Sequence, residues 1–190
     1  MDYQDYKNFI EAVKFTAKAH QENALPEAKK FREFPSGEAN QYYTHCLWGA
    51  IMILLDTKLP ASIREPGAYA LLYHDALEDT SLPLPENTPR EVRKLVDEMT
   101  YVIRDNRGWE TDWQYEKTAV LKRPPLTQLL KLYDKVATLY DGCTPKGKKL
   151  QEWVGLTKKL TSTVEKEYGE LNIVLLSRAL TEKYERQLKA

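Results

Sequence analysis

Two histidines and two aspartates in this sequence could together hold one divalent metal ion. His74 and Asp75 are adjacent, His45 lies upstream, and Asp134 lies downstream. Each lies in or beside an apolar stretch, where a buried polar side chain without a partner costs free energy. Imidazole and carboxylate groups together suit manganese, iron, zinc, cobalt or nickel, and the sequence does not choose among these metals. The four side chains therefore predict a divalent metal site.

An acidic pair follows these candidate ligands by one helical turn. Glu78 lies four residues after His74, on the same face of a helix, and Asp79 comes next. A bound ion would polarise phosphorus and lower the pKa of a water molecule. Glu78 would then orient or deprotonate that water, and Asp79 would assist or protonate the leaving group. The alternative is an ordinary solvated helix end, with a capping histidine and a surface aspartate before it.

His74 and Asp75 can both reach one ion only where the helix is interrupted. Successive helical residues point about 100° apart, so neighbouring side chains diverge along a regular helix. The following segment, residues 80–85, contains two prolines and can supply a helix end. We therefore expect the pair near the end of a buried helix over residues 68–77.

Hydrophobic periodicity near 3.6 residues predicts an all-α chain. Helices are expected over residues 9–20, 43–55, 68–77, 92–102, 124–139 and, in two pieces that break near Gly169, 150–188. The almost wholly apolar segment 43–55 is expected to be central in the core. A long basic loop is expected over residues 21–40, and Pro60 and Pro66 are expected to lie in a connection. No repeat or linker divides the chain, so residues 1–190 are expected to form one compact helical bundle with the metal site in its core.

The composition limits the functional classes. The chain has 28 basic and 28 acidic residues, and this zero net charge argues against a protein dedicated to duplex nucleic acid. No apolar run approaches the ~20 residues that cross a bilayer, and the polar N-terminus lacks a signal-peptide apolar region. A cytoplasmic protein without a membrane segment is therefore expected. Cys46 and Cys143 have no paired spacing and are expected to be free thiols. His20 is expected to be a helix-end residue and not a ligand.

The constellation resembles the HD phosphohydrolase superfamily, whose signature is H…HD…D. Within it, the chain is most similar to the hydrolase domain of RelA/SpoT proteins and to stand-alone small alarmone hydrolases. Four stretches carry the resemblance across roughly residues 8 to 160, namely residues 43–45, 74–80, 95–100 and 130–135. The resemblance implies an all-helical HD bundle, a manganese ion, and removal of the 3′-pyrophosphate from guanosine tetra- or pentaphosphate. By matching positions, it implies the metal ligands His45, His74, Asp75 and Asp134 and the catalytic acids Glu78 and Asp79.

The chain departs from this family at the positions that contact substrate. Thr138 stands where the family usually has an asparagine, four residues after the last metal aspartate. The compact basic strip before the first metal histidine is replaced here by a longer loop. Candidates for substrate binding are Lys29, Lys30 and Arg32 in that loop, and Lys131; for each, the alternative is a solvated surface residue. Candidates for base stacking are Trp109, Trp113, Tyr140 and Tyr43, and the alternative is that they close the core.

Three functions follow as hypotheses. The first is a metal-dependent pyrophosphohydrolase acting on a guanosine tetraphosphate-type nucleotide. The second keeps the metal centre but acts on another small phosphorylated nucleotide, as a nucleotidase or a nucleoside triphosphate hydrolase. The third is a degenerate helical domain that binds a nucleotide or a partner without turnover. The first hypothesis implies degradation and not synthesis, because about 30 further C-terminal residues are too few for a synthetase domain. The oligomeric state is left open.

Overall fold

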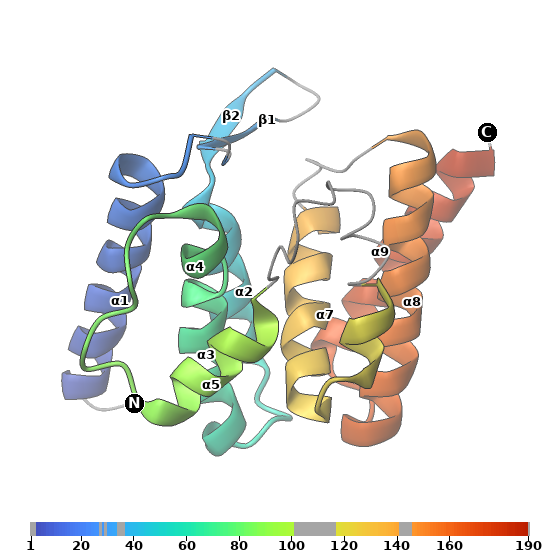
Figure 1. Cartoon of the computed structure of the whole chain (residues 1–190). Helices are drawn as coiled ribbons and strands as arrows, with labels where there is room; N and C mark the ends of the chain where they lie inside the picture. The colour runs from blue at the N-terminus through green and yellow to red at the C-terminus, as the bar shows by residue number, and fades with distance from the viewer. Residues whose placement is uncertain are drawn as a thin grey trace.

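The computed structural model describes residues 3–26, 28, 30–33, 37–100, 117–140 and 146–189. The predicted all-α architecture is confirmed, since helices make up most of the described chain (Figure 1). The helices are α1 (Tyr3–Glu22), α2 (Tyr43–Leu55), α3 (Ala61–Tyr73), α4 (Ala76–Asp79), α5 (Arg90–Met99), α7 (Pro125–Tyr140), α8 (Gly147–Tyr168) and α9 (Asn172–Lys189), with a 3-10 turn, η1, at Val120–Lys122.

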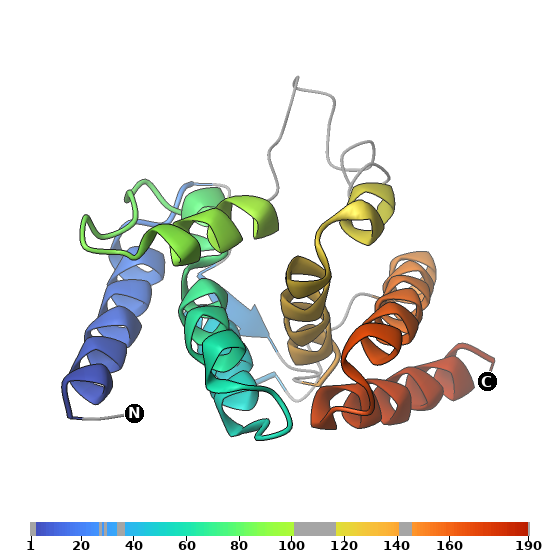
Figure 2. The same cartoon turned by 90° about the horizontal axis from the view of Figure 1, so that it is seen from below.

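Helix α7 lies in the middle of the bundle. It contacts α2, α3 and α5 on one side and α8 and α9 on the other, while α1 packs beyond α3 (Figures 1 and 2). Apart from Lys135, every residue from Thr127 to Leu139 is buried. Helix α7 therefore packs against helices on both of its sides, and its buried polar residues lie at the centre of the molecule.

Helices α3 and α2 differ from what the sequence led us to expect. Helix α3 begins at Ala61, so Pro66 lies inside it and not in a connection as expected. Proline removes the bond to the carbonyl group of Ser62, which lies in the exposed first turn where water can replace it. Helix α2 buries one face only, and Ile51 and Leu55 of this apolar segment are exposed.

The segment expected to be a loop contains a small hairpin. Strand β1 (Phe31–Glu33) pairs antiparallel with β2 (Ala39–Gln41), and Phe31 lies opposite Gln41. Three-residue strands are too short for an alternating pattern to reveal them in a sequence. The hairpin leads directly into α2 and so places its residues beside the start of that helix.

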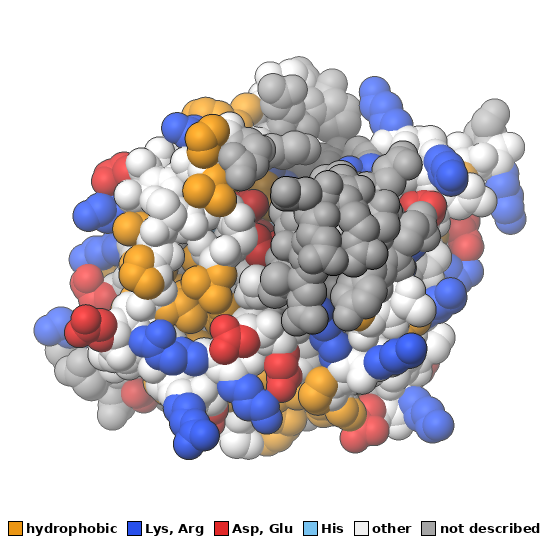
Figure 3. Space-filling model, in the orientation of Figure 1, with side chains coloured by type: hydrophobic (Ala, Val, Ile, Leu, Met, Phe, Trp, Pro, Cys, Tyr) orange, Lys and Arg blue, Asp and Glu red, His pale blue; other side chains and the backbone are white. Residues whose placement is uncertain are grey.

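Charge is mixed over the surface. On the face drawn in Figure 3, lysine and arginine side chains are interspersed with aspartate and glutamate over the described residues. Among the described residues, no helix combines the length and the apolar character that a membrane crossing requires. Cys46 is a free, buried thiol as expected, whereas Cys143 lies outside the described residues.

Candidate active site

The helical backbone is interrupted at the His-Asp pair. Helix α3 ends at Tyr73 and α4 begins at Ala76, so His74 and Asp75 occupy the junction between them. A helix end near the pair was expected, but after residue 77; the break comes earlier and brings His74 Nε2 to 3.0 Å from Asp75 Oδ1. His74 Nδ1 donates a hydrogen bond to the carbonyl oxygen of Leu71 at 2.8 Å. That bond fixes the ring so that Nε2 faces the other candidate ligands.

Helices α2 and α7 bring the other two candidate ligands to the same place. His45 Nε2 lies 2.9 Å from Asp134 Oδ1, and His74 Nε2 lies 3.6 Å from the same oxygen. The ligand atoms of His45, His74 and Asp134 lie within 4.8 Å of one another, as do those of His74, Asp75 and Cys46. The structure thus gathers all four side chains around His74, in what we call the His/Asp cluster: His45, His74, Asp75 and Asp134.

The electrostatics of the His/Asp cluster favour a cation. Burial alone would raise the pKa of Asp134, but Lys135, a hydrogen bond with His45 and the nearby His74 hold it well below its usual range. Burial alone would lower the pKa of His74, yet the charge of Asp75 and further neighbours raise it well above its ordinary value. The two buried carboxylates therefore attract a positive charge. Without a metal ion, a proton on His74 supplies that charge.

The donor set fits a divalent metal ion. All four side chains of the His/Asp cluster are buried, and His74 Nε2 has no hydrogen-bond partner among the described residues despite its closeness to Asp75. A metal ion would pair with this nitrogen and with both carboxylates. Cys46 adds a thiol 3.9 Å from Asp75 Oδ2, and burial raises its pKa to about 11. A protonated thiol donates a weak hydrogen bond and is a poor ligand.

The acidic pair lies on α4, directly after the His/Asp cluster. Burial, reinforced by the charge of Asp75, raises the pKa of Glu78 to about 8, against the opposing charge of Lys131. Burial and the charges of Asp75 and Glu78 likewise raise the pKa of Asp79 to about 8. Groups with such pKa values exchange protons readily near neutral pH, as general acids and bases must.

The predicted substrate-binding residues of α7 are buried at the cluster. Lys131 Nζ lies 3.9 Å from Asp134 Oδ2, so its ammonium group is near the predicted metal ligands. Thr138 is buried too, and its hydroxyl donates to the backbone carbonyl of Asp134 at 3.2 Å. Lys135 Nζ lies closer, 2.9 Å from Asp134 Oδ2. The structure therefore groups three α7 side chains around Asp134.

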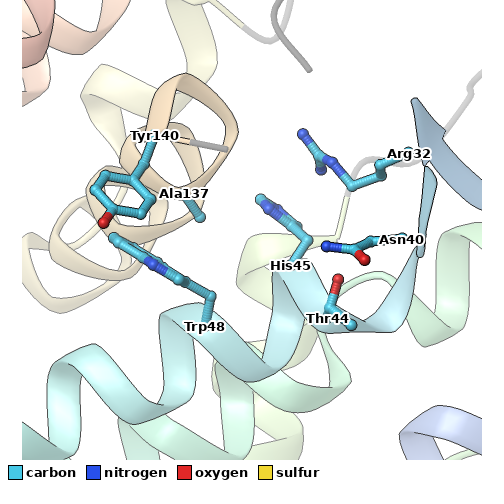
Figure 4. Close-up of a pocket in the computed structure, with 7 residues that line it drawn as sticks. All are labelled: Arg32, Asn40, Thr44, His45, Trp48, Ala137 and Tyr140. Carbon is cyan, nitrogen blue, oxygen red and sulfur yellow. The ribbon is translucent and has the colours of Figure 1, made fainter. Parts of the chain in front are cut away.

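A pocket of about 410 Å³ opens beside the cluster. It is lined by Arg32, Asn40, Thr44, His45, Trp48, Ala137 and Tyr140 (Figure 4). The rings of Trp48 and Tyr140 lie 5.3 Å apart on one side, opposite Arg32 and Asn40 of the hairpin. Arg32 is buried and its guanidinium group lies over the ring of Tyr42, 5.7 Å from the centroid. The pocket therefore joins a candidate ligand to a cation and an aromatic pair.

Among the described residues, Arg32 is the one basic candidate from the loop that lines this pocket. Lys30 is exposed and is not among the pocket-lining residues, and Lys29 lies outside the described residues. Trp109 and Trp113 also lie outside them, and Tyr43 is half-buried at the start of α2. Of the proposed stacking residues, the structure thus places Tyr140 at the pocket.

Some pocket and cluster neighbours were missed from the sequence. Trp48 lies three residues after His45, on the same helical face, and this spacing could have identified it. Asn40 could not be found, because its position depends on the hairpin. His20 lies in the last turn of α1 as expected, but it is buried with its ring 5.4 Å from that of Tyr42.

No protein-family model matches the sequence, and no curated protein matches it significantly. Among solved structures, the chain is similar to a metazoan ortholog of SpoT that hydrolyses ppGpp and plays a role in starvation responses. The TM-score is 0.70 at 19% sequence identity, and the match covers 95% of this chain and 96% of the other. The chain therefore has the helical fold of this SpoT ortholog, and it carries the buried His/Asp cluster within that fold.

Proposed function

We propose that the chain is a metal-dependent phosphohydrolase that acts on guanosine tetraphosphate and releases GDP and pyrophosphate. The observation that carries this proposal is the grouping of a second imidazole and two carboxylates around the buried His74, next to two acids with pKa values of about 8. The likeness to a SpoT ortholog that hydrolyses ppGpp supports the choice of substrate class.

In this proposal the His/Asp cluster holds the metal. The ion is most simply manganese, and iron, zinc, cobalt or nickel are alternatives. When bound, such an ion supplies a Lewis acid for a phosphate oxygen and lowers the pKa of a water molecule. Lys135 keeps Asp134 ionised, because its ammonium group lies 2.9 Å from the carboxylate. Lys131 is our candidate for a contact with a substrate phosphate, since it is the next cation at the cluster.

Glu78 and Asp79 divide the proton transfers. Glu78 accepts a proton from the attacking water as the new oxygen–phosphorus bond forms. Asp79 donates a proton to the ribose 3′ oxygen as the bond from that oxygen to phosphorus breaks. The two roles need one ionised and one protonated acid. Two neighbouring acids with pKa values of about 8 provide that combination, because the charge on the first acid to ionise makes ionisation of the second less favourable.

The pocket beside His45 receives the nucleoside part of the substrate. Its volume, about 410 Å³, falls in the usual range of small-molecule pockets. Trp48 and Tyr140 offer ring faces on which a base can stack. Arg32 provides a planar cation suited to phosphate oxygens.

A second nucleotide substrate is the runner-up, and Thr138 is the observation that favours it. Its hydroxyl donates to the backbone of its own helix and is not the amide that the resemblance leads one to expect. An enzyme acting on a nucleoside mono- or triphosphate would keep the same cluster and acids. In either case we propose a cytoplasmic setting, which suits the free thiol of Cys46.

The deciding experiment is turnover of a nucleotide panel by the purified protein with manganese added. The panel contains guanosine tetra- and pentaphosphate, nucleoside triphosphates and nucleoside monophosphates, and the products are identified by chromatography. Pyrophosphate together with GDP supports the first proposal, whereas products from another member select the second. A wild-type protein that binds metal stoichiometrically and turns over nothing would contradict both.

A further inference from the structure

Lys135 is held between the His/Asp cluster and helix α8. Its Nζ atom lies 2.9 Å from Asp134 Oδ2 and 5.2 Å from the centre of the Trp153 ring. Trp153 is partly buried and packs against the hydrophobic core. One ammonium group therefore contacts a carboxylate of the cluster and an aromatic face at the same time.

The other oxygen of Asp134 faces the histidines. Oδ1 lies 2.9 Å from His45 Nε2 and 3.6 Å from His74 Nε2. Because the two oxygens are fixed to one planar carboxylate, holding Oδ2 also sets the direction of Oδ1. Residues that contact a metal ligand on the side away from the metal orient that ligand, and they commonly influence metal affinity.

The indole ring of Trp153 holds the ammonium group of Lys135 in place. A lysine side chain has four rotatable bonds and points reproducibly only where something fixes its ammonium group. An aromatic face attracts the ammonium group and leaves its N–H groups free to point at a carboxylate. Trp153 is on α8, which packs against α7 and therefore presents the ring at a fixed distance from Asp134.

We propose that Trp153 is a positioning residue for the metal site, acting through Lys135 on Asp134. The inference rests on the proposed function only in that the His/Asp cluster binds a metal ion. It gives α8, which contributes none of the cluster's side chains, a defined part in the chemistry. The indole does not touch the reacting groups, so its effect passes entirely through the lysine.

The test is manganese affinity of the metal-free protein, measured by calorimetry without any nucleotide. Trp153→Leu removes the ring face and is expected to weaken manganese binding about 3- to 10-fold. Trp153→Phe keeps an aromatic face and is expected to restore most of that loss. Lys149→Met is the matched control, because Lys149 lies 6.0 Å from the same ring and no ion pair joins it to Asp134 in the described structure.

A double-mutant cycle separates positioning from packing. If Trp153 acts through Lys135, Trp153→Leu should have little further effect in a Lys135→Met background. The same loss in both backgrounds would overturn the proposal, as would a folded Trp153→Leu protein that binds manganese like the wild type. Because no substrate is present, the result stands even if the nucleotide panel shows no turnover. If the leucine variant does not fold, Trp153→Met removes the ring face but keeps a larger side chain, and wild-type manganese affinity in that variant would likewise overturn the proposal.

Discussion

Asp134 divides its two carboxylate oxygens between different kinds of partner. Oδ1 faces the histidines, while Oδ2 faces the ammonium groups of Lys131 and Lys135. This division keeps the carboxylate ionised in a buried place, where an unpaired charge would be very costly. At the residue scale, the cluster is therefore an arrangement of mutually dependent charges.

Glu78→Gln tests the proposed proton acceptor. The amide keeps the size of the side chain but cannot take a proton, so we expect kcat to fall about 100- to 10,000-fold. Manganese content should be unchanged, because Glu78 is not in the His/Asp cluster. Metal analysis and steady-state kinetics on the substrate found in the panel provide the two measurements.

Two comparison variants complete that experiment. Glu185→Gln, on the exposed face of α9, should leave both kcat and metal content as in the wild type. His74→Ala should lose the metal as well as turnover. Wild-type turnover in Glu78→Gln would remove Glu78 from the mechanism.

The raised pKa of Glu78 predicts a pH dependence of stability in the metal-free protein. Its pKa is about 8 in the folded chain against an ordinary value of 4.5. Between these values the folded chain binds more protons than the unfolded chain, so the contribution of Glu78 to the free energy of unfolding decreases as pH rises. Glu78→Gln has no carboxyl group to titrate at this position. Its free energy of unfolding should therefore increase relative to that of the wild type as the pH rises from 5 to 8. Urea unfolding of both proteins across this range measures the difference, and a constant difference would contradict the assignment.

At the scale of elements, α3 must pack closely against two other helices to present the His-Asp pair. Gly67 makes this approach possible. A Cβ atom at this position would lie 2.7 Å from Ile53 Cδ1 of α2 and 3.1 Å from Leu130 Cδ2 of α7. Both neighbours are fully buried and have little room to move.

Gly67→Ala should therefore destabilise the fold. Overpacking typically costs about 1–3 kcal/mol, which exceeds the ~1 kcal/mol that alanine gains over glycine in a helix. Gly155→Ala is the matched control, since nothing lies within 4 Å of its Cβ position in α8. It should stabilise the protein by up to ~1 kcal/mol. Denaturant unfolding of the two variants isolates the packing cost, and equal effects would contradict the close approach of α3.

At the scale of the whole molecule, Asp56 links both sides of the bundle. Its Oδ2 accepts a hydrogen bond from the Tyr133 hydroxyl of α7 at 3.1 Å and another from the backbone N–H of Asn172, at the start of α9, at 3.0 Å. Asp56 itself caps the end of α2. The end of α2, the middle of α7 and the start of α9 thus meet at one buried carboxylate.

We expect the chain to unfold as one domain. Tyr133→Phe removes one partner of a buried carboxylate and should lower the free energy of unfolding by about 1–3 kcal/mol. Helical circular dichroism and tryptophan fluorescence should report the same shifted midpoint. Tyr6→Phe, on the exposed face of α1, should leave the midpoint unchanged. Separate transitions for the two probes would contradict a single cooperative unit.

Metal binding should stabilise the whole molecule. A ligand that binds only the folded state adds about 2.7 kcal/mol at 100 times its dissociation constant. Manganese should therefore raise the melting temperature of the wild type and leave that of His74→Ala unchanged. Scanning calorimetry with and without manganese makes the comparison, and an unchanged wild-type melting temperature would argue against the metal site.

The sequence alone determined the helical class and the members of the cluster. Helices α2 and α7 stand out in the sequence because both are rich in apolar residues, and His45 and Asp134 are conspicuous as polar exceptions within them. A helix end near His74 could be predicted because neighbouring side chains of a regular helix point in different directions, although its position was placed too late in the chain. These features are local, so they can be recognised without knowing where the helices lie.

Only the tertiary structure decided the distances and the partners. The pairing of Lys135 with Trp153 and the hairpin that brings Arg32 and Asn40 to the pocket join residues far apart in the sequence. The pKa values of Glu78 and Asp79 depend on burial, which arises when the surrounding helices pack around them. Chain spacing cannot encode these quantities, because they depend on how separate helices meet and how completely they exclude water.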